Sequence, residues 1–467
     1  MIQPATGDYE KDRQRHVSWA AERVAAEIQR VTASLEDLWK LRDERLRALV
    51  EHARKNSSWW SQRLDGVEAS TLSGRDLSMI PPMTKDDLMA NWDEIVCDPR
   101  LDLELAEGHL DQIARSGPAY LLDEYHVIAT GGSTGRRAVV VWDFEGWGMS
   151  FVAIQSRGLW QASLADAIPE LPMKVASLMS VNSVHMGAAT AVCFSSPELV
   201  EMHRLSTAAP ISEIVAALEE IQPRALVGYP SILHELALEK LRGGVNIEIE
   251  GVHAGGEPVL PEARACIERA FGVSVTNMWG ASETGFLAAT FPGSEGLVIL
   301  EDTCVIEPVD SQNHPVPSGQ RAAKVLVTNL LNRVLPVIRY EVTDEVTLLD
   351  PLPDGPLHGR RVSEIQGRVD EAFRYVDGTF VHPHLFRSAL TQLSDVAEYQ
   401  VVQTVSGARV ALVARGEIDL EALAKRLEGD LRAAGLSDAR VVVSRVDRLG
   451  RHAHSGKLRR FVPLPER

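Results

Sequence analysis

A chain of 467 residues is too long for one ordinary domain, so at least two domains are expected. The formal charge of −17 argues against a non-specific nucleic-acid binder, because a phosphodiester backbone would be repelled. No apolar run reaches the ~20 residues of a membrane-spanning helix, and the start lacks an apolar signal segment, so we expect a soluble, cytoplasmic protein that binds no membrane.

The first part of the chain has helical patterns. Residues 11–56 are rich in Ala, Glu, Arg and Leu with apolar positions at helical spacing, which predicts two amphipathic helices. Further on, Thr84 follows a rigid turn at Pro81 and Pro82 and can cap a new helix.

A glycine-rich stretch, 129–137, then lies between two apolar runs. Its glycines let backbone N–H groups approach an anion, while its hydroxyl and guanidinium groups can donate to phosphate oxygens. A surface hairpin between two strands is an equally good interpretation of these residues alone. The candidate phosphate ligands are Thr130, Gly132, Ser133, Thr134, Gly135, Arg136 and Arg137.

Strand and helix patterns alternate after this loop. Residues 174–179 and 225–228 are typical of strands, and residues 211–221 and 229–241 of helices, the last opened by Pro230 and Ser231. This alternation predicts an α/β body with a parallel or mixed sheet covered by helices.

A further unit ends at a candidate ligand site. A strand ends in the loop 251–258, residues 260–271 form a helix capped by Gly272, and the strand 273–278 leads to the segment 279–285. There Trp279 offers a flat face to a base and Glu283 offers a carboxylate to a metal ion that accompanies phosphates. A core tryptophan and an exposed loop glutamate are the alternative, which this loop by itself favours.

The last hundred residues predict a small α+β module. Residues 397–414 indicate a hairpin around Ser406 and Gly407, residues 420–436 an amphipathic helix, and residues 439–446 a strand. The four cysteines have no paired spacing, so reduced thiols are expected rather than a zinc site or a disulfide framework; they are Cys97, Cys193, Cys266 and Cys304.

In this order the motifs resemble those of the adenylate-forming superfamily of acyl-CoA synthetases, adenylation domains and luciferases, in its phenylacetate-CoA ligase-like branch. The glycine-rich loop is similar to Ser/Thr-Ser-Gly-Thr-Thr-Gly-Lys-Pro, with Gly131, Arg136 and Arg137 as departures. Residues 228–231 are similar to Gly-Thr-Pro-Ser, 255–258 to Gly-Ala-Glu-Pro, 279–283 to Tyr-Gly-x-Thr-Glu, 336–344 to Pro-Val-Ile-Arg-Tyr-Arg-Thr-Gly-Asp, 367–371 to the hinge Gly-Arg-x-Asp-Asp, and 454–460 to the terminal Ser-Gly-Lys motif.

The resemblance implies roles for individual residues. Asp344 would bind the ribose hydroxyls, Ser282 would lie near the α-phosphate, Glu283 would face Mg²⁺, and Lys457 would complete the adenylation site with Arg368 touching the nucleotide. The remaining ATP-binding positions would be Gly255, Gly256, Glu257, Pro258, Asn277, Met278, Trp279 and Gly280.

The resemblance also implies two domains. A large N-terminal domain of helix-covered β-sheets, residues 1–369, would bind ATP and the acid, and a small, mobile C-terminal α+β domain, residues 370–467, would carry the lysine and pivot at Asp370. The acid pocket is expected beside Tyr229, His185, Met186, Gly187 and Ala281, for which core packing is the alternative.

The expected activity follows from charge. A carboxylate and the α-phosphate of ATP are both negative, so their reaction requires cations, which Arg136, Arg137, Mg²⁺ and Lys457 would supply. The resemblance implies a ligase that activates a small carboxylic acid as acyl-AMP and transfers it to a nucleophile such as CoA, and the branch of the family favours an aromatic acid.

The acceptor and the oligomeric state stay open. Residues 374–385 depart from the family pattern through Asp377, His382 and His384, where the histidines could act as a general base or merely hydrogen-bond in a loop. An amine or a carrier-protein thiol could replace CoA, and a homodimer is possible. Activation of nitrite for diazotisation of an aryl amine, an amide-forming ligase without CoA, and a scaffold without chemistry are the alternative functions.

Overall fold

The computed structural model describes residues 7–130, 137–164, 171–181, 183–196, 200–207, 209–291, 295–350, 359–363, 365, 371–381, 383–390, 393, 395–451 and 457–464. Its N-terminal part is helical, as predicted for residues 11–56. The predicted capping role of Thr84 is confirmed, because its hydroxyl accepts from the N–H of Asp87, whose carboxylate in turn accepts from the N–H of Thr84. The helices are α1 (Tyr9–Val31), α2 (Leu35–Asn56), α3 (Ser58–Arg63), η1 (Ala69–Thr71), α4 (Lys85–Ala90), α5 (Trp92–Ile95) and α6 (Leu103–Ser116).

The glycine-rich loop connects two antiparallel strands, β1 (Tyr125–Ala129) and β2 (Val139–Asp143). Its residues 131–136 lie outside the described part of the chain. After β2 the chain enters α7 (Phe144–Leu164), which the sequence patterns did not predict. Among the described residues, no helix combines the length and the apolar character needed to cross a membrane.

The largest sheet in the described chain has the order β13-β14-β9-β8-β7-β6-β5-β3-β4. Its strands β4, β3, β5, β6 and β7 run parallel, and the other pairs are antiparallel, so the mixed α/β sheet is confirmed. The strands are β3 (Met173–Leu178), β4 (Val200–Arg204), β5 (Ala225–Gly228), β6 (Gly251–Gly255), β7 (Val275–Ala281), β8 (Gly285–Ala289), β9 (Leu297–Ile299), β13 (Leu348–Leu349) and β14 (Arg361–Val362).

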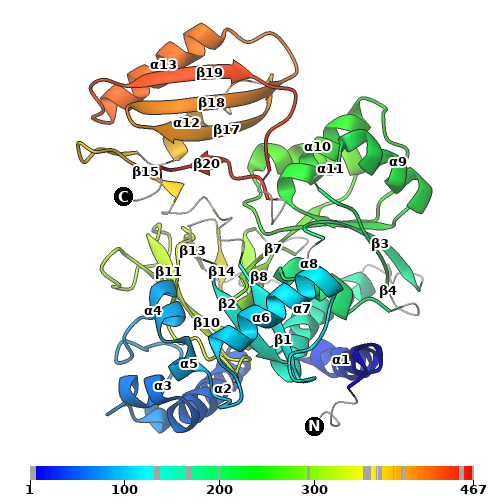
Figure 1. Cartoon of the computed structure of the whole chain (residues 1–467), viewed down its shortest axis with the longest axis vertical. Coiled ribbons are helices and arrows are strands. Elements are labelled where there is room, and N and C mark those ends of the chain that lie inside the picture. Colours follow the sequence, from blue (N-terminus) through cyan, green and yellow to red (C-terminus); the bar gives the residue numbers. More distant parts are fainter. Residues whose placement is uncertain are drawn as a thin grey trace.

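Helices flank the parallel strands (Figure 1). Two predicted helix ends agree with the structure. Gly272 adopts the left-handed conformation (φ 71°) that terminates the helix 261–271, and Pro230 occupies the first turn of the helix 230–241. These helices are α8 (Met186–Cys193), α9 (Ile211–Ile221), α10 (Pro230–Leu241) and α11 (Pro261–Phe271). A second antiparallel sheet contains β10 (Cys304–Val309), β11 (Lys324–Asn329) and β12 (Tyr340–Val342).

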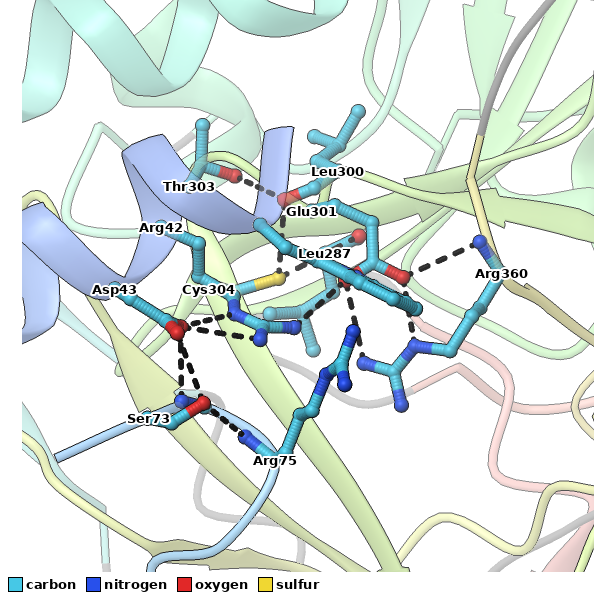
Figure 2. Close-up of polar contacts among 12 residues, drawn as sticks. Arg42, Asp43, Ser73, Arg75, Leu287, Leu300, Glu301, Thr303, Cys304 and Arg360 are labelled. Carbon is cyan, nitrogen blue, oxygen red and sulfur yellow. Dashed lines mark hydrogen bonds and ion pairs between the residues drawn. The ribbon is translucent and has the colours of Figure 1, made fainter. Parts of the chain in front are cut away.

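A buried carboxylate joins the N-terminal helices to the main sheet. Glu301 accepts hydrogen bonds from Arg42 of α2 and from Arg360, which precedes β14, at 3.3 and 2.7 Å (Figure 2). Burial of one carboxylate is tolerated because two guanidinium groups compensate its charge. The strand that leads toward the predicted hinge is therefore tied to α2.

The C-terminal part forms its own sheet, β19-β18-β17-β20, with a hydrophobic core of residues between Phe373 and Phe461. Figure 1 shows this part in orange and red apart from the rest of the molecule. A separate core is what the predicted small domain requires, whereas the boundary near residue 370 falls outside the described residues and stays a prediction. The elements are β15 (Phe373–Arg374), β16 (Phe380–Val381), α12 (His384–Leu390), β17 (Val396–Thr404), β18 (Gly407–Ala414), α13 (Leu420–Ala433), β19 (Arg440–Arg445) and β20 (Phe461–Val462).

Candidate active site

A cavity of about 290 Å³ lies on one face of the parallel strands, with α7 and α8 on its other side. Its position follows from the fold, since Tyr229, Gly255 and Ala281 come at or just after the carboxyl ends of β5, β6 and β7. The five predicted pocket residues all line this cavity: Tyr229, His185, Met186, Gly187 and Ala281.

Lys457 of the C-terminal part lines the same cavity. Its ammonium group lies 5.9 Å from the centroid of the Tyr229 ring. A Cβ added to Gly256 would lie 3.4 Å from Lys457 Cε and 3.1 Å from the Tyr229 ring, so this glycine leaves room for the lysine to pass. Gly256 also has φ 77°, which favours glycine. The geometry therefore brings the predicted catalytic lysine to the predicted pocket.

Glu257 links the two parts of the molecule. Its Oε1 accepts from the backbone N–H of Leu458 at 2.6 Å, and its Oε2 accepts from the backbone N–H of Ser231 at the start of α10 at 3.2 Å. A carboxylate is well placed at a helix N-terminus, where N–H groups lack partners. Since Leu458 follows Lys457 in the chain, this carboxylate fixes the backbone that carries the lysine.

Two arginines of the C-terminal part also contact α10. Arg451 donates to Ser231 Oγ at 2.6 Å, and both Arg448 and Arg451 lie 3.5 Å from the carboxylate of Glu235. In Figure 1 the red chain after β19 descends to α10 before it returns to β20. The descending segment is thus held on the large body at several points.

The predicted nucleotide residues Trp279 and Asp344 contact each other. The indole N–H of Trp279 donates to Asp344 Oδ2 at 2.8 Å, and both side chains are at least 94% buried. Trp279 is therefore a positioned core residue, and its expected stacking on adenine stays a prediction. An oriented Asp344 carboxylate can still accept hydrogen bonds from hydroxyl groups.

Glu283 is also oriented by a neighbour. The hydroxyl of Tyr340 donates to Glu283 Oε1 at 2.9 Å, while Oε2 has no hydrogen-bond partner among the residues that the structure describes. The sequence alternative of an exposed loop glutamate is excluded, because the residue is only 5% exposed. A single carboxylate oxygen is a suitable ligand for Mg²⁺, which proteins hold with few ligands of their own.

The remaining predicted positions fall into two groups. Gly255, Gly256, Met278, Gly280 and Ser282 line the cavity. Asn277 is buried within β7 and its backbone N–H donates to Thr290 Oγ1 at 2.7 Å, while Pro258 follows Glu257 in the loop after β6. Three glycines and a serine of this group leave room for a ligand to come close to the backbone.

Several predicted residues lie outside the described part of the chain: Gly132, Ser133, Thr134, Gly135, Arg136, Arg368, Asp370 and His382. Thr130, at the start of the glycine-rich loop, is described, and its hydroxyl accepts from the backbone N–H of Ala138 at 2.8 Å. Arg137 is exposed at the other end of the loop and lies 3.9 Å from Glu107.

Lys85 is a cation that the sequence analysis missed. Its Nζ donates to Thr130 Oγ1 at 3.2 Å, which brings a positive charge from α4 to the glycine-rich loop. The cap Thr84 signalled that Lys85 begins a helix, but only the parallel bridge between Met83 and Tyr340 places that helix at the site.

Burial sets the protonation of two residues on the cavity wall. It raises the pKa of the Tyr229 hydroxyl to about 12, although the backbone N–H of Ser180 donates to that oxygen at 3.2 Å. It also lowers the pKa of His253. Both side chains are therefore neutral at physiological pH, and Lys457 brings a cationic group to this wall.

The four cysteines are free thiols, as expected.

Comparisons with known proteins show which proteins the chain is similar to in sequence and in fold. No protein-family model matches the sequence. The chain is 24% identical over 391 residues to phenylacetate-coenzyme A ligase of Escherichia coli K12, and 26% identical over 386 residues to the Thermus thermophilus protein of the same name, with 79% of each chain covered in both cases. The crystal structure of 2-hydroxyisobutyryl-CoA ligase with 2-HIB-AMP in the postadenylation state has a TM-score of 0.70 at 20% identity, covering 94% of this chain and 92% of that one, which shows a shared fold.

Proposed function

The chain belongs to the adenylate-forming superfamily, in its phenylacetate-CoA ligase-like branch, as an ATP-dependent, AMP-forming ligase, and on this premise we propose that it converts a carboxylic acid to acyl-AMP and then to a CoA thioester. The observation that carries the proposal is the position of Lys457. A lysine from the C-terminal part reaches the cavity beside Gly256, and Ser282 lines the same cavity, in which a carboxylate would meet the α-phosphate.

The first step requires charge neutralisation. The carboxylate oxygen attacks the α-phosphorus, the bond from that phosphorus to the pyrophosphate oxygen breaks, and pyrophosphate leaves. Lys457 would donate to the oxygens that gain charge, in a cavity whose described lining holds no Asp, Glu or Arg and no second Lys, so its field is weakly screened. Mg²⁺ held by Glu283 would neutralise phosphate charge when bound.

Other residues would orient the nucleotide. Asp344, itself held by Trp279, offers a carboxylate to the ribose hydroxyls, and Lys85 at Thr130 stands where the glycine-rich loop would hold phosphates. In the second step the thiolate of CoA would attack the acyl carbon, and AMP would leave with the oxygen that came from the acid.

The test is pyrophosphate release from ATP and Mg²⁺ with panels of aromatic, aliphatic and amino acids, followed by addition of CoA. We expect release that depends on the acid, and a thioester in an amount equal to the AMP formed. Release with nitrite and no carboxylic acid, or an amide with lysine in place of a thioester, would favour the alternative functions. No release with any of these compounds would contradict ligase activity.

A further inference from the structure

One face of the parallel sheet borders the cavity along almost its whole length. On β3 the cavity is lined by Met173, Val175 and Ser177, whereas the intervening Ala176 and Leu178 pack into the core. Successive side chains of a strand point to opposite faces, so the cavity follows the strand itself. Val227 of the central strand β5 is only partly buried for the same reason.

The cavity is long. Its lining runs from Met173 to Met179, a step of six residues along β3 that corresponds to about 20 Å at about 3.3 Å per residue. The strand register places Val200 and Met202 of β4 beside Met173 and Val175, and Ala225 of β5 on the other side of Val175. These residues mark the end of the cavity that is farthest from Lys457, which lies beside Tyr229 at the opposite ends of the strands.

The far end is apolar. Every strand residue that lines it is apolar, namely Met173, Val175, Val200, Met202 and Ala225. Methionine side chains adapt to flexible apolar partners, and a surface of this composition repels a polar or charged group. Between the two ends of the cavity lies the imidazole of His253, which is neutral because burial lowers its pKa. It can hydrogen-bond a water molecule, and it places no charge beside an apolar chain.

We infer that the acid is an elongated, apolar acyl chain whose carboxylate lies at Lys457 and whose tail follows β3 toward Val175 and Met202. This inference rests on the proposed ligase function and differs from the compact aryl acid that the sequence resemblance suggested. A water molecule takes up about 30 Å³ in the liquid, and a methylene group is of similar size. A cavity of about 290 Å³ therefore has room for a chain of about ten carbons.

The test compares straight-chain acids of increasing length with phenylacetate, by kcat/KM for pyrophosphate release. Each added methylene should raise kcat/KM by about fourfold, the equivalent of about 0.8 kcal/mol of burial, up to about ten carbons. Decanoate should exceed phenylacetate by at least about tenfold. A preference for phenylacetate, or a value that falls as the chain grows, overturns the chain-length inference and leaves the ligase function intact. Absence of release with every acid overturns both.

Variants of the cavity lining locate the tail. Met202→Trp adds bulk to a partly buried position on β4 and should shift the preferred length to shorter acids by several carbons. Ala191→Leu on α8 adds bulk on the opposite wall and should shift it in the same direction, which guards against misfolding of the first variant. Glu201→Gln is the matched control, since its carboxylate pairs with His203 at 2.8 Å instead of lining the cavity. An unchanged length profile in both folded variants overturns the inference.

Discussion

Glu257 accepts a hydrogen bond of 2.6 Å from the backbone N–H of Leu458, 201 residues further along the chain and directly after Lys457. The same carboxylate accepts from the start of α10. One side chain thus connects the backbone next to Lys457, the proposed catalytic lysine, to the start of α10 beside the cavity. We propose that it holds the lysine in the pose that forms the adenylate.

The substitution Glu257→Gln tests this role. The amide keeps one acceptor oxygen and loses the charge, so one of two charge-assisted hydrogen bonds is lost or weakened, each worth about 1.5–3 kcal/mol. Acid-dependent ATP–pyrophosphate exchange should fall about 10- to 100-fold, while thioester formation from added acyl-AMP should change much less. Glu250→Gln, at an exposed pair with Arg224, is the control. Equal losses in both half-reactions would show a general structural role instead.

Lys457→Ala should abolish the first half-reaction. Loss of one preorganised donor to a developing oxyanion lowers rates by about 10²–10³. Exchange measures the step, and calorimetry with ATP should show that the nucleotide still binds. Lys425→Ala on the exposed face of α13 is the matched control, because this lysine pairs with Glu421 one turn away, at 2.8 Å, and lies outside the cavity lining. Near-normal exchange in Lys457→Ala would refute the catalytic role.

If Asp344 binds the ribose and Trp279 orients it, substitution of Asp344 should weaken ribose binding more than substitution of Trp279. Asp344→Asn should raise the Kd for ATP about tenfold or more and should remove the preference for ATP over its 2′-deoxy analogue, because the amide accepts fewer hydroxyl hydrogen bonds. Trp279→Phe removes the N–H that orients Asp344, together with part of the buried ring, and should weaken ATP binding while part of the preference remains. Unaltered discrimination in Asp344→Asn would place the ribose elsewhere.

A buried glutamate of the C-terminal part predicts a pH dependence of stability. Burial raises the pKa of Glu398 from its ordinary value of 4.5 to about 7, against the opposing effects of Arg460, at 3.3 Å, and Arg451; Glu235 and Glu257 add to the rise. The folded chain then binds this proton more tightly than the unfolded chain. The contribution to the unfolding free energy is therefore full below about pH 4.5 and is lost as the pH rises through about 7.

Glu398→Gln should remove this slope, which amounts to about 1–3 kcal/mol between the two pH values. Urea unfolding at a series of pH values measures it, with Glu421→Gln on the exposed face of α13 as the control. A slope that persists in Glu398→Gln would assign it to other groups.

Local sequence signals predicted much of the fold. The helix α9 and the strand β5 have the predicted bounds, because periodicity and the neighbouring proline mark them. Helix α7 was not predicted because its own apolar residues, such as Phe151 and Ile154, are spread around the helix and give no one-sided apolar pattern. The helix packs against both the core and the cavity.

Contacts between distant residues could not be read from the sequence. Lys85 meets Thr130 over 45 residues and Trp279 meets Asp344 over 65, and both contacts depend on how the sheets are assembled. The apolar far end of the cavity depends on β4 pairing with the first residues of β3, which no local pattern specifies. The resemblance indicated cavity residues such as Tyr229 and Lys457. The apolar far end of the cavity could be identified only from the structure.

The most direct test of the central claim follows the oxygen atoms of the acid. An active acid with heavy-isotope oxygen in its carboxylate is incubated with the enzyme, ATP, Mg²⁺ and CoA, and the AMP is analysed by mass spectrometry. Attack of the carboxylate on the α-phosphorus predicts AMP that carries one heavy oxygen for each thioester formed. Unlabelled AMP beside a labelled or absent thioester would contradict the formation of an acyl-adenylate at this site.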